Sequence, residues 1–147
     1  MQLDLNQLMT MNQEQLDKLF KENTSGPIPD GEAEGRAIIA PGKKIEATAA
    51  RLIHLLAWQG KVFDSKAGEL RNRILPMGIH AIVAKVYKAD SWFDGKECIV
   101  LDYSQTSLIA HWIRDEIRCV GNGLYLGIVY WNKTKLIDFA LQFPTHP

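Results

Sequence analysis

Apolar residues change their spacing along this chain of 147 residues, and the change separates a helical part from a strand-rich part. Within 43–57, apolar side chains recur at steps of three and four residues and Gly60 follows, so this segment predicts a long helix. Residues 11–22 carry a narrower apolar stripe and predict a short helix with Thr10 as its N-cap. The glycines and prolines of NTSGPIPDGEAEG, at 23–35, predict a loop.

The rest of the chain consists of short apolar runs separated by turn residues. GRAIIAPG, at 35–42, predicts one short strand that ends in a turn. The later runs are KVFD, ELRNRIL, HAIVAKVYKAD, KECIVLDY, HWIRDEIRCV, GLYLGIVYW and KLIDFALQF. Closely spaced strands of this kind are typical of an antiparallel meander, and closure removes its exposed edges. The predicted fold is therefore mainly β (α+β): a closed or nearly closed barrel of six to eight strands, with a helix at each of the two positions above.

The segment SLIAHWIRDEIRCV fits a helix as well as a strand, because its apolar residues satisfy both spacings. We favour a turn over 104–110 followed by a strand. The Gly121-Asn122-Gly123 turn and the strand-like GLYLGIVYW behind it make a hairpin natural at this place.

The alternation of side chains along the strands predicts where polar groups face. One side of each strand is almost entirely apolar, and the other side mixes small, apolar and charged residues. A barrel whose lumen holds a few polar groups produces this pattern, so Lys85, Tyr87, Asp102 and Asp138 are predicted to converge inside. ELRNRIL brings polar groups to both faces of its strand, and aromatic side chains such as tryptophan stack on flat ligands. The predicted ligand-binding residues are Lys85, Tyr87, Asp102, Trp92, Arg73 and Asp138.

Asp102 has two interpretations. As a lumenal carboxylate it needs Lys85 or an arginine as a partner, because an unpaired buried charge is costly. Alternatively, it caps the turn that begins at Tyr103-Ser104. The sequence leaves both open.

Other chemistry-bearing residues lack a supporting pattern. Asp115 and Glu116 are adjacent in a predicted strand and face opposite ways, so we expect a solvated, salt-bridged surface rather than an acid–base pair. His111 lies near Ser104, but no nucleophile elbow of the GxSxG type accompanies them. The four histidines are scattered, and the two cysteines are far apart and predicted to be reduced. We therefore expect no metal and no cofactor.

Composition narrows the partners. The formal net charge of +0 gives no broad positive field for nucleic acid, and no segment is apolar for long enough to span a bilayer. The first residues lack the basic and apolar regions of a secretory signal, so a cytoplasmic location is expected. The length suits a single domain over 1–147, in which an N-terminal helix and Pro/Gly linker (1–30) precede the helix and barrel (31–147).

Four segments carry a resemblance: WQGKVFD, RNRI, SWFDGKECIVLDYS and IRDEIRCVGNGLYLG. Their order resembles the layout of small lipocalin-like (calycin) barrels. It is also similar to uncharacterised bacterial GXWXG-type domains, in which a W-x-G-K-x-F element precedes antiparallel strands. The glycine-tryptophan-glycine signature itself reads Ala57-Trp58-Gln59-Gly60 here. The resemblance covers residues 57–143 and implies a container for a small apolar or cyclic ligand; it carries over no catalytic residue.

Three functions follow as hypotheses. The first is a small intracellular protein that binds a small hydrophobic or amphipathic molecule in the barrel lumen. The second is a metal-independent isomerase, cyclase or lyase that uses the same pocket and needs a perturbed acid beside a tyrosine or lysine. The third is an interaction module in which the helix at 11–22 docks a partner or builds a homodimer.

Overall fold

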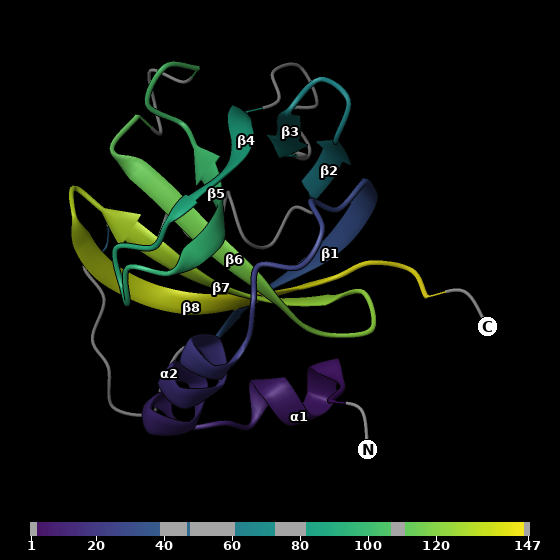
Figure 1. Ribbon diagram of the computed structural model, residues 1–147, viewed down its shortest axis with the longest axis vertical. Helices are drawn as coiled ribbons and strands as arrows, with labels where there is room; N and C mark the ends of the chain where they lie inside the picture. Colours follow the sequence, from purple (N-terminus) through teal and green to yellow (C-terminus); the bar gives the residue numbers. More distant parts are fainter. Residues whose placement is uncertain (1–2, 39–46, 48–60, 73–81, 107–110, 146–147) are drawn as a thin grey trace.

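The computed structural model describes residues 3–38, 47, 61–72, 82–106 and 111–145. Within these residues, eight strands form a closed antiparallel barrel in which each strand pairs with the next and β1 pairs with β8 (Figure 1). The strands are β1 (Gly31–Ile38), β2 (Lys61–Asp64), β3 (Glu69–Asn72), β4 (Ile82–Asp90), β5 (Glu97–Asp102), β6 (Ile113–Gly121), β7 (Leu124–Trp131) and β8 (Thr134–Gln142). The predicted mainly β, closed-barrel fold is confirmed.

Two short helices, α1 (Leu5–Met9) and α2 (Gln13–Glu22), lie side by side against the outside of the barrel (Figure 1). The helix predicted at 11–22 is confirmed as α2, but its N-cap is Asn12, whose side chain accepts from the Gln15 backbone N–H in a capping box. The predicted cap, Thr10, instead ends α1, a helix that the apolar pattern did not predict. The long helix predicted at 43–57 lies, Ala47 apart, outside the described residues.

Strand β1 corrects the prediction of a loop over 23–35. It begins at Gly31, so GEAEG forms its first half. Gly35 pairs with Leu141 and Ala37 with Phe139 on β8, and these partners are large. Small residues on β1 leave room for those side chains, so strand pairing overrides the weak β propensity of glycine and alanine.

The ambiguous segment near residue 113 is a strand, as favoured from the hairpin signal. β6 and β7 pair along their length and join through a tight turn at Asn122 and Gly123. Gly123 has φ +65°, a left-handed conformation that glycine adopts without penalty.

Apolar side chains form two clusters, one on each side of the barrel wall. The inner cluster includes Ile99, Leu101, Ile113, Ile117 and Phe139. The outer cluster joins α1 and α2 to the wall through Leu8, Leu16, Phe20, Ile38, Cys98, Val100, Leu124, Leu126, Ile128, Tyr130 and Ala140. The apolar stripe of α2 is therefore used within the chain, with Leu16 and Phe20 each 1% exposed.

Aromatic rings fill one end of the barrel interior. The Phe143 ring meets those of Phe63 and Tyr125 edge-on, at centroid distances of 5.4 Å and 5.6 Å. Nearby on β7, Gly127 faces Phe139, and a Cβ atom added at Gly127 would lie 2.2 Å from the Phe139 ring. Phe139 thus occupies the space above a glycine, which makes that glycine necessary for packing.

Arg118 fastens α2 to the barrel. Its side chain is fully buried on the outer face of β6, with the guanidinium 4.3 Å from the Phe20 ring centroid. Both terminal nitrogens donate to the Asp94 carboxylate at 2.7 Å. Further hydrogen bonds reach the backbone oxygens of Phe20, Lys96 and Glu97. One side chain therefore ties the end of α2 to the turn between β4 and β5.

Candidate functional site

Three polar side chains lie inside the barrel near one end: Lys61, Tyr103 and Asp115. Lys61 opens β2, Tyr103 follows the last residue of β5, and Asp115 is the third residue of β6. These strand ends meet because neighbouring strands are antiparallel, and Asp115 pairs with Leu101, two residues before Tyr103. The inward side of β6 is marked by Ile113 and Ile117, which flank Asp115 and belong to the inner cluster. We call these three residues the lumenal triad.

The triad is almost completely removed from solvent. Lys61 is 1%, Tyr103 0% and Asp115 2% exposed. The Lys61 Nζ donates a hydrogen bond to the Tyr103 hydroxyl oxygen at 3.2 Å and lies 5.9 Å from the centre of the Tyr103 ring. An ammonium group and a phenol hydroxyl therefore share the interior with a carboxyl group.

Asp115 has an unsatisfied atom. Its Oδ1 is buried and, among the described residues, accepts no hydrogen bond. Most buried polar atoms in proteins have a partner, and an unpaired one destabilises the fold by about 1–3 kcal/mol. A carboxyl oxygen held in this state is a feature that a bound molecule with a hydrogen-bond donor would satisfy.

Burial moves both charged groups of the triad toward neutrality. Desolvation raises the pKa of Asp115 to about 7, although the charge of Lys61 opposes this rise. Desolvation lowers the pKa of Lys61 to about 8, and the charge of Asp115 again opposes the change. Both groups can therefore exchange protons near neutral pH, which suits acid–base chemistry.

Lys85, Tyr87 and Asp102 lie on the outer face, so the prediction that they point into the lumen is wrong. Lys85 is exposed, Tyr87 is 38% exposed, and Lys85 pairs with Asp102 across β4 and β5. The cause is the outer cluster: the helices cover part of the wall, so the outer face carries apolar residues as well as charged ones. On β5, the side with Ile99 and Leu101 is the inner one.

Asp102 caps the turn after β5, so the second of its two interpretations is the one that the structure supports. Its Oδ1 accepts hydrogen bonds from the Ser104 backbone N–H at 2.9 Å and from the Ser104 hydroxyl at 2.6 Å. Its Oδ2 accepts from the Tyr87 hydroxyl at 2.7 Å. Partial burial opposes ionisation, but these hydrogen bonds outweigh it and lower the pKa of Asp102.

Two more of the predicted site residues, Asp138 and Trp92, are also apart from the triad. Asp138 is buried on the outer face of β8 under α2, where its carboxylate accepts from the Gln13 amide at 2.7 Å and lies 3.4 Å from the Lys135 Nζ. Trp92 is 48% exposed, with the Arg114 guanidinium 4.3 Å from its ring centroid. Arg73 lies outside the described residues.

Asp115 and Glu116 face opposite sides of the wall, as predicted, but neither is solvated. Glu116 is 0% exposed on the outer face, where it accepts from the Ser91 hydroxyl at 2.5 Å and the Trp92 N–H at 2.8 Å. Arg114 pairs with it at 3.1 Å. The expectation of a solvated surface is therefore wrong for both carboxylates.

The alternation of the sequence contained the signal for two members of the triad. Asp115 shares its side of the strand with Ile113 and Ile117, and Tyr103 shares its side with Leu101. Lys61 had no such signal, because β2 is only four residues long.

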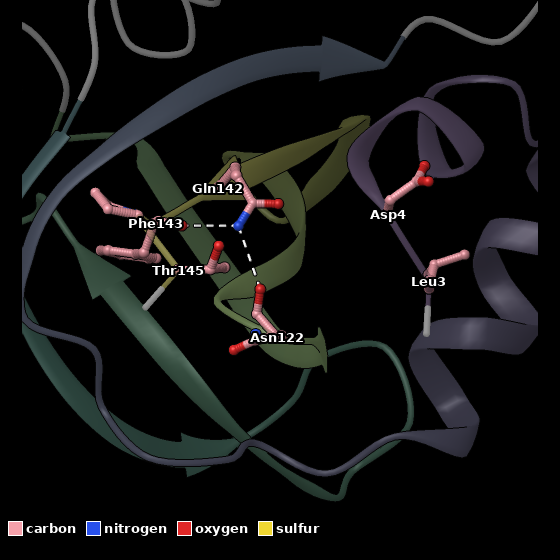
Figure 2. A pocket seen from close by; sticks show the side chains of 7 residues that line it. Leu3, Asp4, Asn122, Gln142, Phe143 and Thr145 are labelled. Atoms are coloured by element: carbon pink, nitrogen blue, oxygen red, sulfur yellow. Dashed lines mark hydrogen bonds between the residues drawn. The ribbon is translucent and has the colours of Figure 1, made fainter. Parts of the chain in front are cut away.

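A hollow of about 490 Å³ lies on the surface between the start of the chain and the end of β8. It is lined by Leu3, Asp4, Asn122, Gln142, Phe143, Pro144 and Thr145 (Figure 2). The Gln142 amide donates to the backbone oxygens of Asn122, Gly123 and Phe143. The Gln142 amide at this hollow therefore already has hydrogen-bond partners, unlike the Asp115 Oδ1.

Within the described part of the chain, no group of three or more His, Cys, Asp or Glu side chains is placed to hold a metal ion. Neither described helix is long and apolar enough to cross a bilayer.

No family model matches the chain, and no curated protein matches it. A solved structure described as "Crystal structure of protein from Thermomonospora curvata" is similar in fold, with a TM-score of 0.60 and 14% sequence identity over 91% of this chain and 88% of that one. This likeness shows a shared fold and nothing about activity. The calycin and GXWXG resemblances are not confirmed by these comparisons.

Proposed function

We propose that this protein binds a small, largely apolar molecule inside the barrel, with the polar group of that molecule held by the lumenal triad. The supporting observation is the buried Asp115 Oδ1 without a hydrogen-bond partner among the described residues. A ligand hydroxyl would donate to this oxygen, and its own oxygen would accept from Lys61. Ile113, Ile117 and Leu101 provide apolar surroundings for the remainder of the molecule.

Native mass spectrometry first checks the purified protein for co-purified molecules. The protein is then titrated with 1-decanol, and isothermal titration calorimetry measures the affinity. Asp115→Asn keeps the size of the side chain but replaces one carboxyl oxygen by an amide donor. We expect binding to weaken about tenfold, the effect of losing one charge-assisted hydrogen bond. Circular dichroism checks that the variant is folded.

Asp102→Asn is the matched control, because Asp102 is a partly buried carboxylate on the outer face. Its 1-decanol affinity should equal that of the wild type. A role in ligand binding stays a prediction for six residues, Lys85, Tyr87, Trp92, Arg73, Asp102 and Asp138, and this control tests it for Asp102. Weaker binding by Asp102→Asn with unchanged binding by Asp115→Asn would reverse the assignment and refute the proposal.

The catalytic alternative, a metal-independent isomerase, cyclase or lyase, has one feature in its favour. Inside the barrel, burial raises the pKa of Asp115 against the opposing charge of Lys61, and Lys61 is hydrogen-bonded to Tyr103. Loss of turnover with unchanged ligand affinity in Asp115→Asn would support catalysis over binding alone. A homodimer also stays a prediction, although the apolar stripe of α2 already packs on its own barrel.

A further inference from the structure

Lys61 differs from the other described lysines because its amine lies within the barrel. Resting on the lumenal binding proposed above, we propose that Lys61 is a nucleophile that forms an imine with an aldehyde or ketone ligand, while Asp115 and Tyr103 transfer the protons. The ligand class is thereby narrowed to small apolar carbonyl compounds. A carbonyl carbon is the electrophile that an amine attacks reversibly without any further reactant.

Position favours this chemistry. Lys61 is 1% exposed, and among the described lysines it is the buried one. Its Nζ lies 3.2 Å from the Tyr103 hydroxyl, within reach of a proton relay. Asp115 offers a free oxygen in the same interior, where a protonated carboxyl can donate to a carbonyl or hydroxyl oxygen.

The state of the amine also favours it. Only the neutral amine attacks a carbonyl carbon, and an ordinary lysine, with a pKa of about 10.4, is almost entirely protonated at pH 7.5. Burial lowers the pKa of Lys61 to about 8, so a substantial fraction of it is neutral at that pH.

The step balances without an oxidant or reductant. The Lys61 nitrogen forms a bond to the carbonyl carbon as the carbon–oxygen π electrons move to oxygen, and a proton passes from nitrogen to that oxygen through the Tyr103 hydroxyl. Asp115 in its protonated form then donates to the hydroxyl, which leaves as water while the nitrogen lone pair completes the C=N bond. The resulting iminium cation faces the Asp115 carboxylate, which stabilises it and then takes the proton from its nitrogen, giving the neutral imine and restoring protonated Asp115. The net reaction joins the amine and the carbonyl compound with loss of one water.

Reductive trapping tests the proposal. The full chain is incubated with limiting octanal and sodium cyanoborohydride at pH 7.5, and peptide mass spectrometry locates the alkylated lysine. We expect Lys61 to be modified at least about tenfold faster than Lys85 and Lys88, which are exposed on the outer face. Lys61→Met should abolish the fast phase, whereas Lys88→Met, the surface control, should retain it.

A second measurement separates this inference from the proposed function. Binding of 1-octanol, which cannot form an imine, is measured with the wild type and Lys61→Met. Modification of the surface lysines without a fast adduct at Lys61 overturns the inference. If 1-octanol still binds in that case, lumenal binding stands alone; if it does not bind, both proposals fall.

Discussion

The buried Arg118 should carry a large share of the stability of this fold. Arg118→Met removes the ion pair with Asp94, whose side chain is 9% exposed, and the hydrogen bonds that the guanidinium donates to the backbone oxygens of Phe20, Lys96 and Glu97. Breaking a buried charge pair from one side typically destabilises by about 3–5 kcal/mol. Methionine recovers part of this through apolar contact with Phe20, so we expect a loss of about 3 kcal/mol.

The assay is urea unfolding followed by circular dichroism, with a thermal melt alongside. For a chain of this length, about 3 kcal/mol corresponds to a fall in Tm of about 6–12 °C. The stability of Arg118→Lys should lie between those of the wild type and Arg118→Met, because lysine keeps the charge but lacks the planar guanidinium. Arg36→Met is the control, since Arg36 pairs with Glu34 in solvent and such pairs contribute about 0–1 kcal/mol.

The same pair should respond to acid. The hydrogen bonds from Arg118 lower the pKa of Asp94, so the pair stabilises the fold above the unfolded-state value of about 3.9 and loses this effect as the pH falls through the lower folded-state value. The stability gap between wild type and Arg118→Met should therefore narrow on acidification below that pH. A variant within about 1 kcal/mol of the wild type at pH 7 would refute the structural role assigned to Arg118.

Three further predictions concern packing, pH and the helices. Gly127→Ala should destabilise the fold by about 1–3 kcal/mol because the added Cβ meets the Phe139 ring. Adding Phe139→Leu should recover part of that loss. Additive effects of the two substitutions in a double-mutant cycle would contradict this contact. Burial in the folded state raises the pKa of Asp115 above its unfolded value, so the contribution of Asp115 to stability falls as the pH rises from about 4 to about 7. Urea unfolding should show this fall in the wild type relative to Asp115→Asn. Parallel pH profiles of the two proteins would argue against burial of the carboxyl group. A chain beginning at Ser25 lacks both helices and exposes the outer cluster, so size-exclusion chromatography with light scattering should show self-association. A monomer with the wild-type Tm would contradict the role given to α1 and α2.

The strand pattern could be predicted from sequence because period-two alternation and turn residues are local properties. The closed barrel also followed, since a meander of this length otherwise leaves edges exposed. The start of β1 did not follow, because GEAEG becomes a strand only through pairing with β8, far away in the chain. Its small residues suit large partners that no local pattern identifies.

The site was predicted less well than the fold, for a physical reason. Alternation tells which residues share a face, but not which face is inside, and here the helices make part of the outer wall apolar as well. Lys85, Tyr87 and Asp102 were consequently assigned to the wrong side. Asp115 shares its face with Ile113 and Ile117, so ranking the strand faces by apolar content would have found it.

Asp115 holds a carboxyl group inside the barrel, away from water, and the proposed function depends on this placement. The most direct test is a pH titration of the aspartate side-chain ¹³Cγ resonances in ¹³C-labelled wild-type protein, with Asp115→Asn to assign the signal. We predict that the resonance missing from the variant titrates near pH 7, because burial raises its pKa to about 7. A missing resonance that titrates near pH 4, as for an aspartate in water, would contradict the account.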